Sequence, residues 1–298
     1  MKLIADSGST KTDWTLLHDS SVHSDDVFVA KFKTQGVTPI HQSPEEIRQI
    51  LAQELLPQLS TFSRAQLVNS KILESPLLSN IQVFFYGSGC TPAHIPMMKQ
   101  MLTEVFSPQT VEVYSDLMAA ARALCGHEEG IACILGTGAN SCLFDGEKII
   151  QNTPALGYIL GDEGSGSVLG RLFMNAIFKD TRFTALRDTY LEENKLTMPL
   201  IINKVYREPL ANRFLASTAS FIHEHLDFSP LRELVIGNFR TFFQHNLVQY
   251  QRRDLPVHAV GSIAFHFQEE LKEAAAQEGF EIGTILSAPM EGLIRYYQ

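Results

Sequence analysis

The sequence predicts an α/β protein with two domains, each built on a mixed β-sheet flanked by helices. The chain has 298 residues, which is longer than the chains that usually fold around a single hydrophobic core. Strand-like segments lead each half of the chain, and helical segments follow them. A strand, glycine-rich tip and second strand near the N-terminus return later with Gly138 in the place of Gly8, an offset of 130 residues. This repeat indicates two similar halves, which we expect to close around a cleft.

The first domain is predicted to span residues 1–115. It opens with strand-like segments and then alternates strands with helices, which is typical of a mixed sheet covered by helices. Ser43 is the expected N-cap of a helix that begins at Pro44. The expected elements are three strands within 3–33, a helix from 44, a strand at 81–87, a helix after Pro92 and a strand at 111–114.

The second domain is predicted to span residues 116–298, with a helical insertion at about 163–250. A final short helix, about 289–298, is expected to pack back on the first domain. The expected elements are a helix from Ser115 or Asp116, strands within 130–152, helices across the insertion, a strand at 255–261, a helix at 262–279 and a strand at 280–288.

Composition narrows the classes of partner. A net charge of −9 argues against nucleic acid or an anionic membrane as a partner. No apolar run approaches the roughly 18 residues of a membrane helix. The N-terminus meets a charge after three apolar residues, so we expect no signal peptide. Four cysteines without CxxC spacing suggest buried, reduced thiols and a cytoplasmic protein.

The first glycine-rich tip has two interpretations. Its small residues offer backbone N–H groups that could cradle a phosphate, and Asp6 beside them could hold hydrated Mg²⁺. An ordinary Gly/Ser/Asp turn is the alternative. The second tip, Gly136–Asn140, has the same character, and two such tips could clamp a polyphosphate between them. The chain lacks GxxxxGK[ST], so the common phosphate loop is not expected.

A dinucleotide site is disfavoured. Gly87-x-Gly89 follows a strand, but Pro92 stands where the third glycine or alanine of that fingerprint is needed for close packing.

Three further segments can each be interpreted in two ways, as structural or as functional. Asp116, where a strand meets a helix, is either a cap or first-turn charge of that helix or a general base. Asp162 and Glu163, bracketed by glycines, either begin the next helix or approach a polar ligand. Gly261-Ser262 either permits a tight turn or lets an adenine ring lie over the backbone.

In order and spacing, these motifs resemble the actin-like ATPase superfamily of sugar kinases, actin and chaperone ATPases. The sequence is most similar to its BadF/BadG/BcrA/BcrD-type branch, which includes N-acetylglucosamine kinases. The segments that carry the resemblance are "DSGSTKT" from Asp6, Asp116 before its helix, "GTGAN" from Gly136, "GDEGS" from Gly161 and "VGS" ending at Ser262.

The resemblance implies two ribonuclease-H-like domains around a cleft that holds ATP, Mg²⁺ and a small-molecule sugar. It makes Asp116 the general base and Asp6 the residue that orients the metal. It implies a homodimer as well, since relatives form dimers. It assigns phosphate or nucleotide contacts to Gly8, Ser9, Thr10, Lys11, Gly136, Thr137, Gly138, Gly261 and Ser262, and sugar contacts to Thr38, Asn140, Asp162 and Glu163.

Two positions depart from the sugar-kinase pattern. Thr38 replaces an asparagine that touches the sugar, and Ala139 replaces a small hydroxyl residue near the acetamido group. The sequence therefore predicts a kinase that transfers phosphate from ATP to an amino sugar or hexose, with the 6-hydroxyl of N-acetylglucosamine as the expected acceptor. The alternatives are an ATPase that activates an acyl-CoA dehydratase or reductase, and a sugar or nucleotide sensor without turnover.

Overall fold

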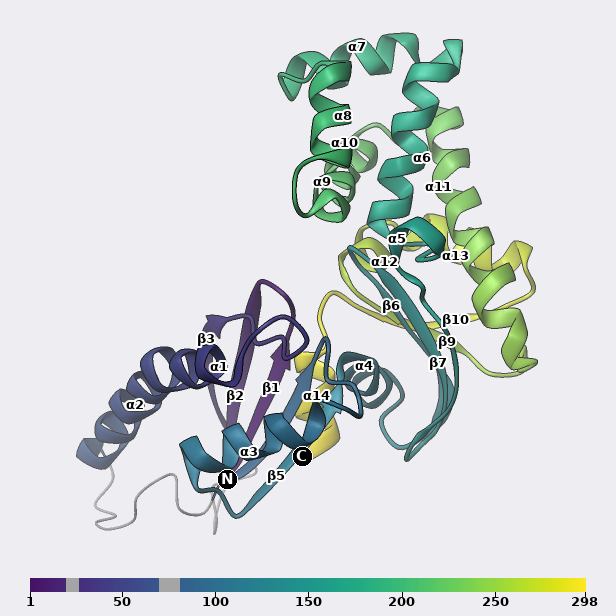
Figure 1. Cartoon of the computed structure of the whole chain (residues 1–298). Helices are drawn as coiled ribbons and strands as arrows, with labels where there is room; N and C mark the ends of the chain where they lie inside the picture. The colour runs from purple at the N-terminus through teal and green to yellow at the C-terminus, as the bar shows by residue number, and fades with distance from the viewer. Residues whose placement is uncertain (20–26, 70–80) are drawn as a thin grey trace. The chain divides into compact units, whose positions relative to one another are not determined.

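The computed structural model describes residues 1–19, 27–69 and 81–298 (Figure 1). The chain divides into two compact units. Unit 1 comprises Met1–Ala123 with Pro289–Gln298, and unit 2 comprises Leu124–Ala288. The boundary after Ala123 lies later than residue 115, because the helix that begins at Asp116 packs on the sheet of unit 1.

Unit 1 contains a five-stranded mixed sheet with the order β3-β2-β1-β4-β5. Strands β1 to β3 form an antiparallel meander, and β4 and β5 run parallel to β1. The register places Asp6 opposite Asp13 and beside Tyr86. The strands are β1 (Lys2–Ser7), β2 (Lys11–Asp19), β3 (Val27–Gln35), β4 (Gln82–Gly87) and β5 (Thr110–Ser115).

Unit 2 repeats this topology. Its sheet has the order β10-β9-β6-β7-β8, with β6 to β8 antiparallel and β9 and β10 parallel to β6. Counted within its own unit, each sheet reads 3-2-1-4-5, which is the ribonuclease-H-like arrangement. The duplication expected from the two glycine tips is confirmed. The strands are β6 (Glu129–Leu135), β7 (Ala139–Asp145), β8 (Ile149–Thr153), β9 (Val257–Val260) and β10 (Ile282–Leu286).

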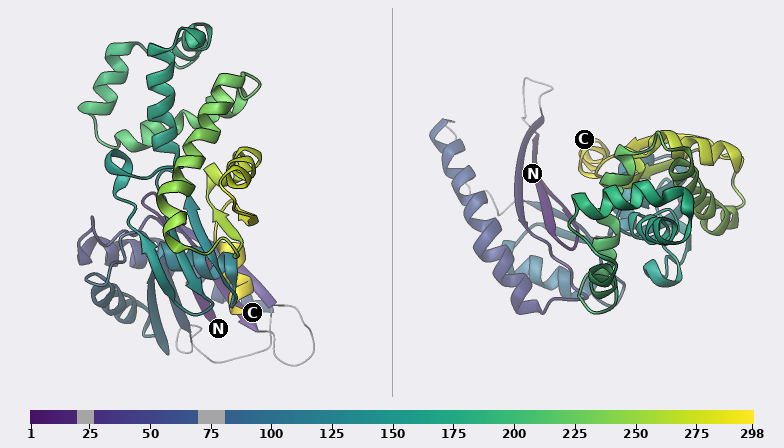
Figure 2. Two further views of the ribbon diagram at one scale, coloured as in Figure 1. Left: turned by 90° about the vertical axis from the view of Figure 1, so that its right-hand side faces the viewer. Right: turned by 90° about the horizontal axis from the view of Figure 1, so that it is seen from above.

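Helices cover both faces of the unit 1 sheet (Figures 1 and 2). One face packs against α1 (Pro44–Ile50), η1 (Leu51–Leu55) and α3 (Ile95–Phe106), around the fully buried Trp14. The other packs against α4 (Asp116–Cys125) and α14 (Met290–Tyr297). Alternating residues of β1 therefore enter two different cores. The helix α2 (Leu56–Asn69) continues η1.

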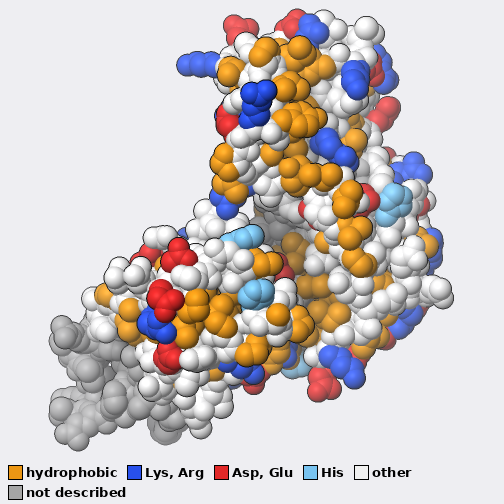
Figure 3. Space-filling model, viewed as in Figure 1, with side chains coloured by type: hydrophobic (Ala, Val, Ile, Leu, Met, Phe, Trp, Pro, Cys, Tyr) orange, Lys and Arg blue, Asp and Glu red, His pale blue; other side chains and the backbone are white. Residues whose placement is uncertain are grey.

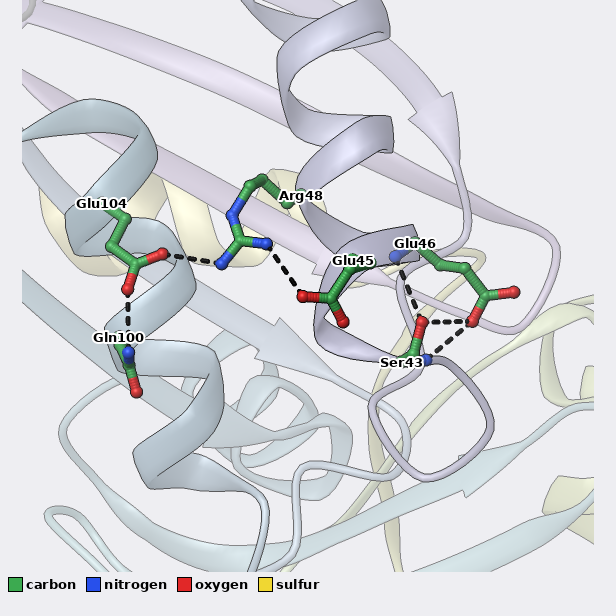
Figure 4. Close-up of polar contacts among 6 residues, drawn as sticks. All are labelled: Ser43, Glu45, Glu46, Arg48, Gln100 and Glu104. Carbon is green, nitrogen blue, oxygen red and sulfur yellow. Dashed lines mark hydrogen bonds and ion pairs between the residues drawn. The ribbon is translucent and has the colours of Figure 1, made fainter.

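The start of α1 is capped by its own side chains (Figure 4). Ser43 Oγ accepts the Glu46 N–H at 3.3 Å, and Glu46 Oε2 accepts the Ser43 N–H at 2.7 Å. This capping box confirms Ser43 as the N-cap. Arg48 then bridges Glu45 and Glu104 at 3.3 and 2.9 Å, which ties α1 to α3.

Between β8 and β9, the chain of unit 2 is helical. Its helices α6 and α11 run together (Figure 2), and Phe173 and Phe239 from them pack with Ile131 of the sheet. The helices of unit 2 are α5 (Gly157–Leu160), α6 (Gly166–Lys179), η2 (Thr181–Phe183), α7 (Thr184–Glu193), α8 (Met198–Tyr206), α9 (Ala211–Ser217), α10 (Ala219–Glu224), α11 (Ser229–Phe242), η3 (Phe243–Leu247), η4 (Val248–Tyr250), α12 (Ser262–His266) and α13 (Gln268–Gln277).

One expected helix is divided. The segment 262–279 forms α12 and α13 because Phe267 leaves the helical conformation and places its ring, 1% exposed, in the core. Large apolar side chains are exposed over the insertion (Figure 3); on α8 they are Met198, Leu200, Ile202 and Tyr206. Within the described ranges, no helix has the length and apolarity to cross a membrane.

Within unit 1, a cluster around Arg122 joins the C-terminal helix α14 to α4 and β4. The Arg122 Nη1 donates to the hydroxyls of Tyr86 and Tyr297 at 2.8 and 3.3 Å, and these hydroxyls lie 2.5 Å apart. The guanidinium also lies 4.1 Å from the ring centre of Tyr114. A cation held against aromatic rings and hydroxyls links α4, β4 and α14.

The packing of α14 on α4 yields a stability prediction. A Cβ at Gly292 would lie 2.1 Å from the Ala123 carbonyl oxygen, so Gly292→Ala must displace backbone. We expect a loss of at least about 2 kcal/mol of unfolding free energy in denaturant titrations. Gly237→Ala in α11 is the matched control, because its Cβ would meet nothing within 4 Å. It should be neutral or stabilise by about 0.5–1 kcal/mol. Equal effects of the two substitutions would contradict the packing described.

Candidate active site

The first glycine tip is a compact turn between β1 and β2. The Gly8 N–H donates to the Lys11 carbonyl at 3.0 Å, and the Gly36 N–H donates to the Thr10 carbonyl at 3.1 Å. A Cβ at Gly36 would lie 2.3 Å from the Gly8 oxygen. Backbone thus packs directly on backbone, and a side chain at Gly36 would displace the tip.

Buried hydroxyls support this tip from below. Ser7 Oγ lies 2.6 Å from Thr12 Oγ1, donates to the Val37 carbonyl at 2.8 Å and accepts the Val37 N–H at 2.9 Å. Both hydroxyl side chains are fully buried. They hold the turn in shape and are committed to that structural role.

Asp6 lies at the end of β1 in a negative environment. Burial raises its pKa from 3.8 to about 7, and the carboxylates of Asp13 and Asp116 add to the increase, against the opposing charge of Lys11. Lys11 Nζ lies 2.6 Å from Asp13 Oδ2. Asp13 belongs to no motif of the sequence, and only the strand register shows that it faces Asp6.

Asp116 is the first residue of α4, and it is not the N-cap. Ser115 Oγ accepts the Met118 N–H at 3.2 Å, which is the capping contact. The Asp116 carboxylate accepts the Leu117 N–H at 2.9 Å. Burial raises the pKa of Asp116, while that N–H, its own N–H and the Ser88 hydroxyl lower it. The carboxyl therefore keeps its proton more strongly than an exposed aspartate does.

Asp6 and Asp116 both lie where a strand of the unit 1 sheet ends. Asp6 is near the carboxyl end of β1 and Asp116 directly follows β5, and parallel strands end at one edge of a sheet. Ligands of open α/β sheets bind at this edge. In the part of the chain that the structure describes, no group of three or more His, Cys, Asp or Glu side chains is arranged to hold a metal ion.

Thr38, also in unit 1, has an unused hydroxyl. Its N–H donates to Gln42 Oε1 at 2.6 Å, but its buried Oγ1 has no hydrogen-bond partner. A buried hydroxyl without a partner is costly unless a ligand or water satisfies it.

The second glycine tip is joined to the start of α6. The Gly136 N–H donates to the Gly138 carbonyl at 3.0 Å. The Gly166 N–H donates to the Gly136 carbonyl at 2.8 Å, and both the N–H and the hydroxyl of Ser167 donate to the Thr137 carbonyl, at 3.1 and 2.7 Å. The first turn of α6 therefore braces the tip.

Asp162 points to the second tip. Its φ of +53° is in the left-handed region, and its Oδ2 would lie 3.1 Å from a Cβ at Gly138. Burial raises the pKa of Asp162, with the Ala139 N–H lowering it and the Glu163 charge raising it. Ser165, not Asp162, caps α6. The structure thus brings the segments GTGAN and GDEGS together.

Glu163 is held by the π-helical segment η3. His245 Nδ1 lies 3.0 Å from Glu163 Oε1, and Asn246 Nδ2 donates to Oε2 at 3.5 Å. Burial would raise the pKa of Glu163, but the hydrogen bonds, that from His245 foremost, outweigh it and lower the pKa. Neither partner was found from the sequence, because they are more than 80 residues away.

Asn140 also has fixed partners. Its Oδ1 accepts the Ser141 N–H and an N–H of Asn152 Nδ2, both at 2.9 Å. Asn152 belongs to no motif of the sequence, and only the pairing of β7 with β8 brings it beside Asn140.

Gly261 forms a turn that only glycine permits. Its φ is +127°, and a Cβ would lie 2.3 Å from the Leu135 oxygen. Its N–H donates to the Leu286 carbonyl at 3.0 Å. Ser262 then begins α12. The turn is therefore packed against the strand that leads into the second glycine tip.

The predicted residues form two groups. In unit 1 they are Asp6, Gly8, Ser9, Thr10, Lys11, Thr38 and Asp116, and in unit 2 they are Gly136, Thr137, Gly138, Asn140, Asp162, Glu163, Gly261 and Ser262.

Comparison with solved structures identifies the family. A structure described as "Putative N-acetylglucosamine Kinase" from Porphyromonas gingivalis is 44% identical, matches 100% of this chain and 98% of its own, and has a TM-score of 0.87. A protein of the same description from Chromobacterium violaceum is 18% identical over 100% and 98% of the chains, with a TM-score of 0.72, which shows the shared fold. No family model and no curated protein matches.

The chain belongs to the family of the Porphyromonas protein.

The environment of Asp6 predicts a pH dependence of stability. Because its pKa is about 7 in the folded protein and 3.8 ordinarily, the folded state holds the proton more tightly. The resulting stability is lost as the pH rises from about 4 through about 7. Wild type loses this stability between pH 5 and pH 8, and Asp6→Asn does not. Over that range, the unfolding free energy of Asp6→Asn relative to that of wild type should rise by on the order of 2 kcal/mol, measured by denaturant titration. Asp227→Asn, at an exposed position, is the control. Parallel curves for Asp6→Asn and wild type would contradict the prediction.

Proposed function

We propose that the protein is an ATP-dependent sugar kinase that transfers the γ-phosphoryl group to the 6-hydroxyl of N-acetylglucosamine. The observation that carries the proposal is the partly buried Asp116 carboxyl at the start of α4, whose charge also raises the pKa of Asp6 beside a glycine tip. The description of the 44% identical relative supports the same activity. Membership of the BadF/BadG/BcrA/BcrD-type branch stays a prediction.

The nucleotide contacts come from three turns. Each unit offers one candidate phosphate-binding tip, Gly8–Lys11 in unit 1 and Gly136–Gly138 in unit 2. The donors would be backbone N–H groups other than those of Gly8 and Gly136, which donate within their own turns, and Lys11 would add a positive charge. The turn at Gly261-Ser262 would receive adenosine, as the resemblance of its VGS segment implies. The missing Cβ of Gly261 lets the Leu135 backbone pack against this turn and fix its shape. Both tips are braced by neighbouring backbone, which favours preorganised binding.

Asp6 fits a role beside Mg²⁺. Its raised pKa reflects burial and uncompensated negative charge, which a cation would relieve. Magnesium in phosphoryl-transfer sites often takes one or two carboxylates and completes its shell with water and phosphate oxygens. When bound, the ion would neutralise charge on the phosphates. Asp6, with Asp13 across the strand pair, would hold it.

Asp116 would accept the proton of the attacking sugar hydroxyl. A base with a raised pKa keeps that proton more readily than an exposed aspartate, provided that it begins deprotonated. Asp162 and Glu163 would accept hydrogen bonds from sugar hydroxyls, while Asn140 and the unpartnered Thr38 hydroxyl would complete the substrate contacts. Phosphoryl transfer asks mainly for such positioning and charge stabilisation.

No observation favours the activator alternative. The four cysteines are free and buried, and burial raises the pKa of each thiol, whereas cluster ligands are thiolates. The proposal keeps the expected homodimer and the cytoplasmic location; light scattering of the purified protein tests the former.

A panel of sugars tests the proposed function. ADP formation from MgATP is measured with N-acetylglucosamine, N-acetylmannosamine, glucosamine, glucose and buffer alone. We expect the largest stimulation with N-acetylglucosamine and a product phosphorylated at the 6-position by NMR. If no sugar raises ADP formation above the buffer control, the kinase proposal is wrong.

Replacement of the proposed base separates binding from chemistry. Asp116→Asn should lower kcat about 100-fold or more, because the proton acceptor is removed, while ATP binding by calorimetry stays near wild type. Asp227→Asn should leave both unchanged. Retained turnover in Asp116→Asn would reject Asp116 as the base.

A further inference from the structure

The orientation of the Asn140 amide is set by the protein. Its Oδ1 accepts two hydrogen bonds at 2.9 Å, one from the Ser141 N–H and one from Asn152 Nδ2. With the oxygen engaged twice, the group that Asn140 presents to a ligand is its NH₂, which only donates. Rotation of the amide by 180° would bring this NH₂ against two donors.

The partner, Asn152, is itself oriented without ambiguity. Its Nδ2 also donates to the Ser141 carbonyl at 2.7 Å and to the Thr153 carbonyl at 3.1 Å. Two of its three partners are backbone carbonyls, so this atom must be the amide nitrogen, and one of its two hydrogens is shared between two acceptors. Asn152 lies opposite Cys142 in the β7–β8 pair, and Cys142 is two residues from Asn140, so both asparagines share one face of the sheet.

The backbone that carries Asn152 is anchored from the protein interior. The hydroxyl of Tyr250, 4% exposed, lies 2.7 Å from Ser141 Oγ and accepts the Thr153 N–H at 3.1 Å. Thr153 Oγ1 donates to the Asn246 carbonyl at 2.8 Å. Although the Asn152 side chain is exposed, the residue therefore sits on fixed backbone, and its contact with Asn140 is preorganised.

Asp162 supplies the opposite polarity nearby. Its carboxylate accepts the N–H of Ala139, the residue before Asn140. An ionised carboxylate only accepts hydrogen bonds. This edge of unit 2 thus combines one acceptor-only group with one group held as a donor.

We propose that Asn152 is a positioning residue that holds Asn140 as a hydrogen-bond donor toward the substrate. This inference rests on the proposed function. It deepens that function by assigning polarity: the sugar offers an acceptor oxygen to Asn140 and a hydroxyl hydrogen to Asp162. Without Asn152, the Asn140 amide rotates more freely and presents its donor for only part of the time.

Steady-state kinetics of Asn152→Leu test the proposal. Leucine matches the size of asparagine but donates no hydrogen bond. We expect the KM for N-acetylglucosamine to rise about 5- to 10-fold, with kcat and the KM for ATP within about 2-fold of wild type. Gln151→Leu is the matched control, since this neighbouring amide on β8 donates instead to the Gln249 carbonyl. It should leave all constants unchanged.

A double-mutant cycle separates positioning from a structural role. In an Asn140→Ala background, Asn152→Leu should add less than about 2-fold to the sugar KM, because the group it positions is gone. Thermal unfolding of each variant is measured in parallel. An additive effect, or a rise in both KM values with a lowered unfolding temperature, would overturn the proposal.

Deoxy and deoxyfluoro sugars test the polarity. Fluorine accepts a weak hydrogen bond but donates none. At the position that contacts Asn140, the fluoro analogue should therefore bind the wild type more tightly than the deoxy analogue, and Asn140→Ala should abolish the difference. Equal binding of each such pair to the wild type would overturn the assignment.

The two levels of proposal fail differently. If the wild type turns over with sugar but Asn152→Leu is unchanged, this inference alone is wrong. If the wild type shows no sugar-dependent ADP formation, the proposed function is wrong and the inference falls with it.

Discussion

Direct contact of backbone with backbone is the constraint on which both glycine tips depend. Gly36 lies so close to the first tip that a Cβ would meet the Gly8 oxygen at 2.3 Å, and Gly261 lies equally close to the Leu135 oxygen beside the second tip. No side chain fits at either position. The turns are consequently narrow and braced, and their small residues leave backbone exposed at the end of the central strands.

The edge of the unit 1 sheet carries a concentration of negative charge. Asp6, Asp13 and Asp116 gather there, and Lys11, whose charge lowers the pKa of Asp6, is itself paired with Asp13. Like charges near a partly buried carboxylate are unfavourable, and together with burial they raise the pKa of Asp6. The same arrangement suits a site whose ligand brings a divalent cation with polyphosphate.

In the second unit, neighbouring groups hold the candidate site side chains, both neutral and charged, in fixed orientations. Asp162 is fixed by a backbone N–H, Glu163 by the π-helical segment η3, and Asn140 by the strand beside it. π-Helical segments occur frequently at functional sites, where they re-aim side chains. In unit 2, Asn140, Asp162 and Glu163 thus each have a supporting residue, and rigid support is what selective recognition of a sugar requires.

The sequence alone determined the duplicated α/β architecture, the Ser43 cap and the turn positions, because periodicity, capping residues and glycines act over a few residues. The resemblance of its motifs then supplied the candidate site residues. Only tertiary structure decided that Asp13 faces Asp6, that Asn152 orients Asn140 and that His245 holds Glu163. Strand register and helix packing set these pairs, and both depend on burial summed over the whole unit. A pattern of a few residues therefore does not specify which distant residues will pair.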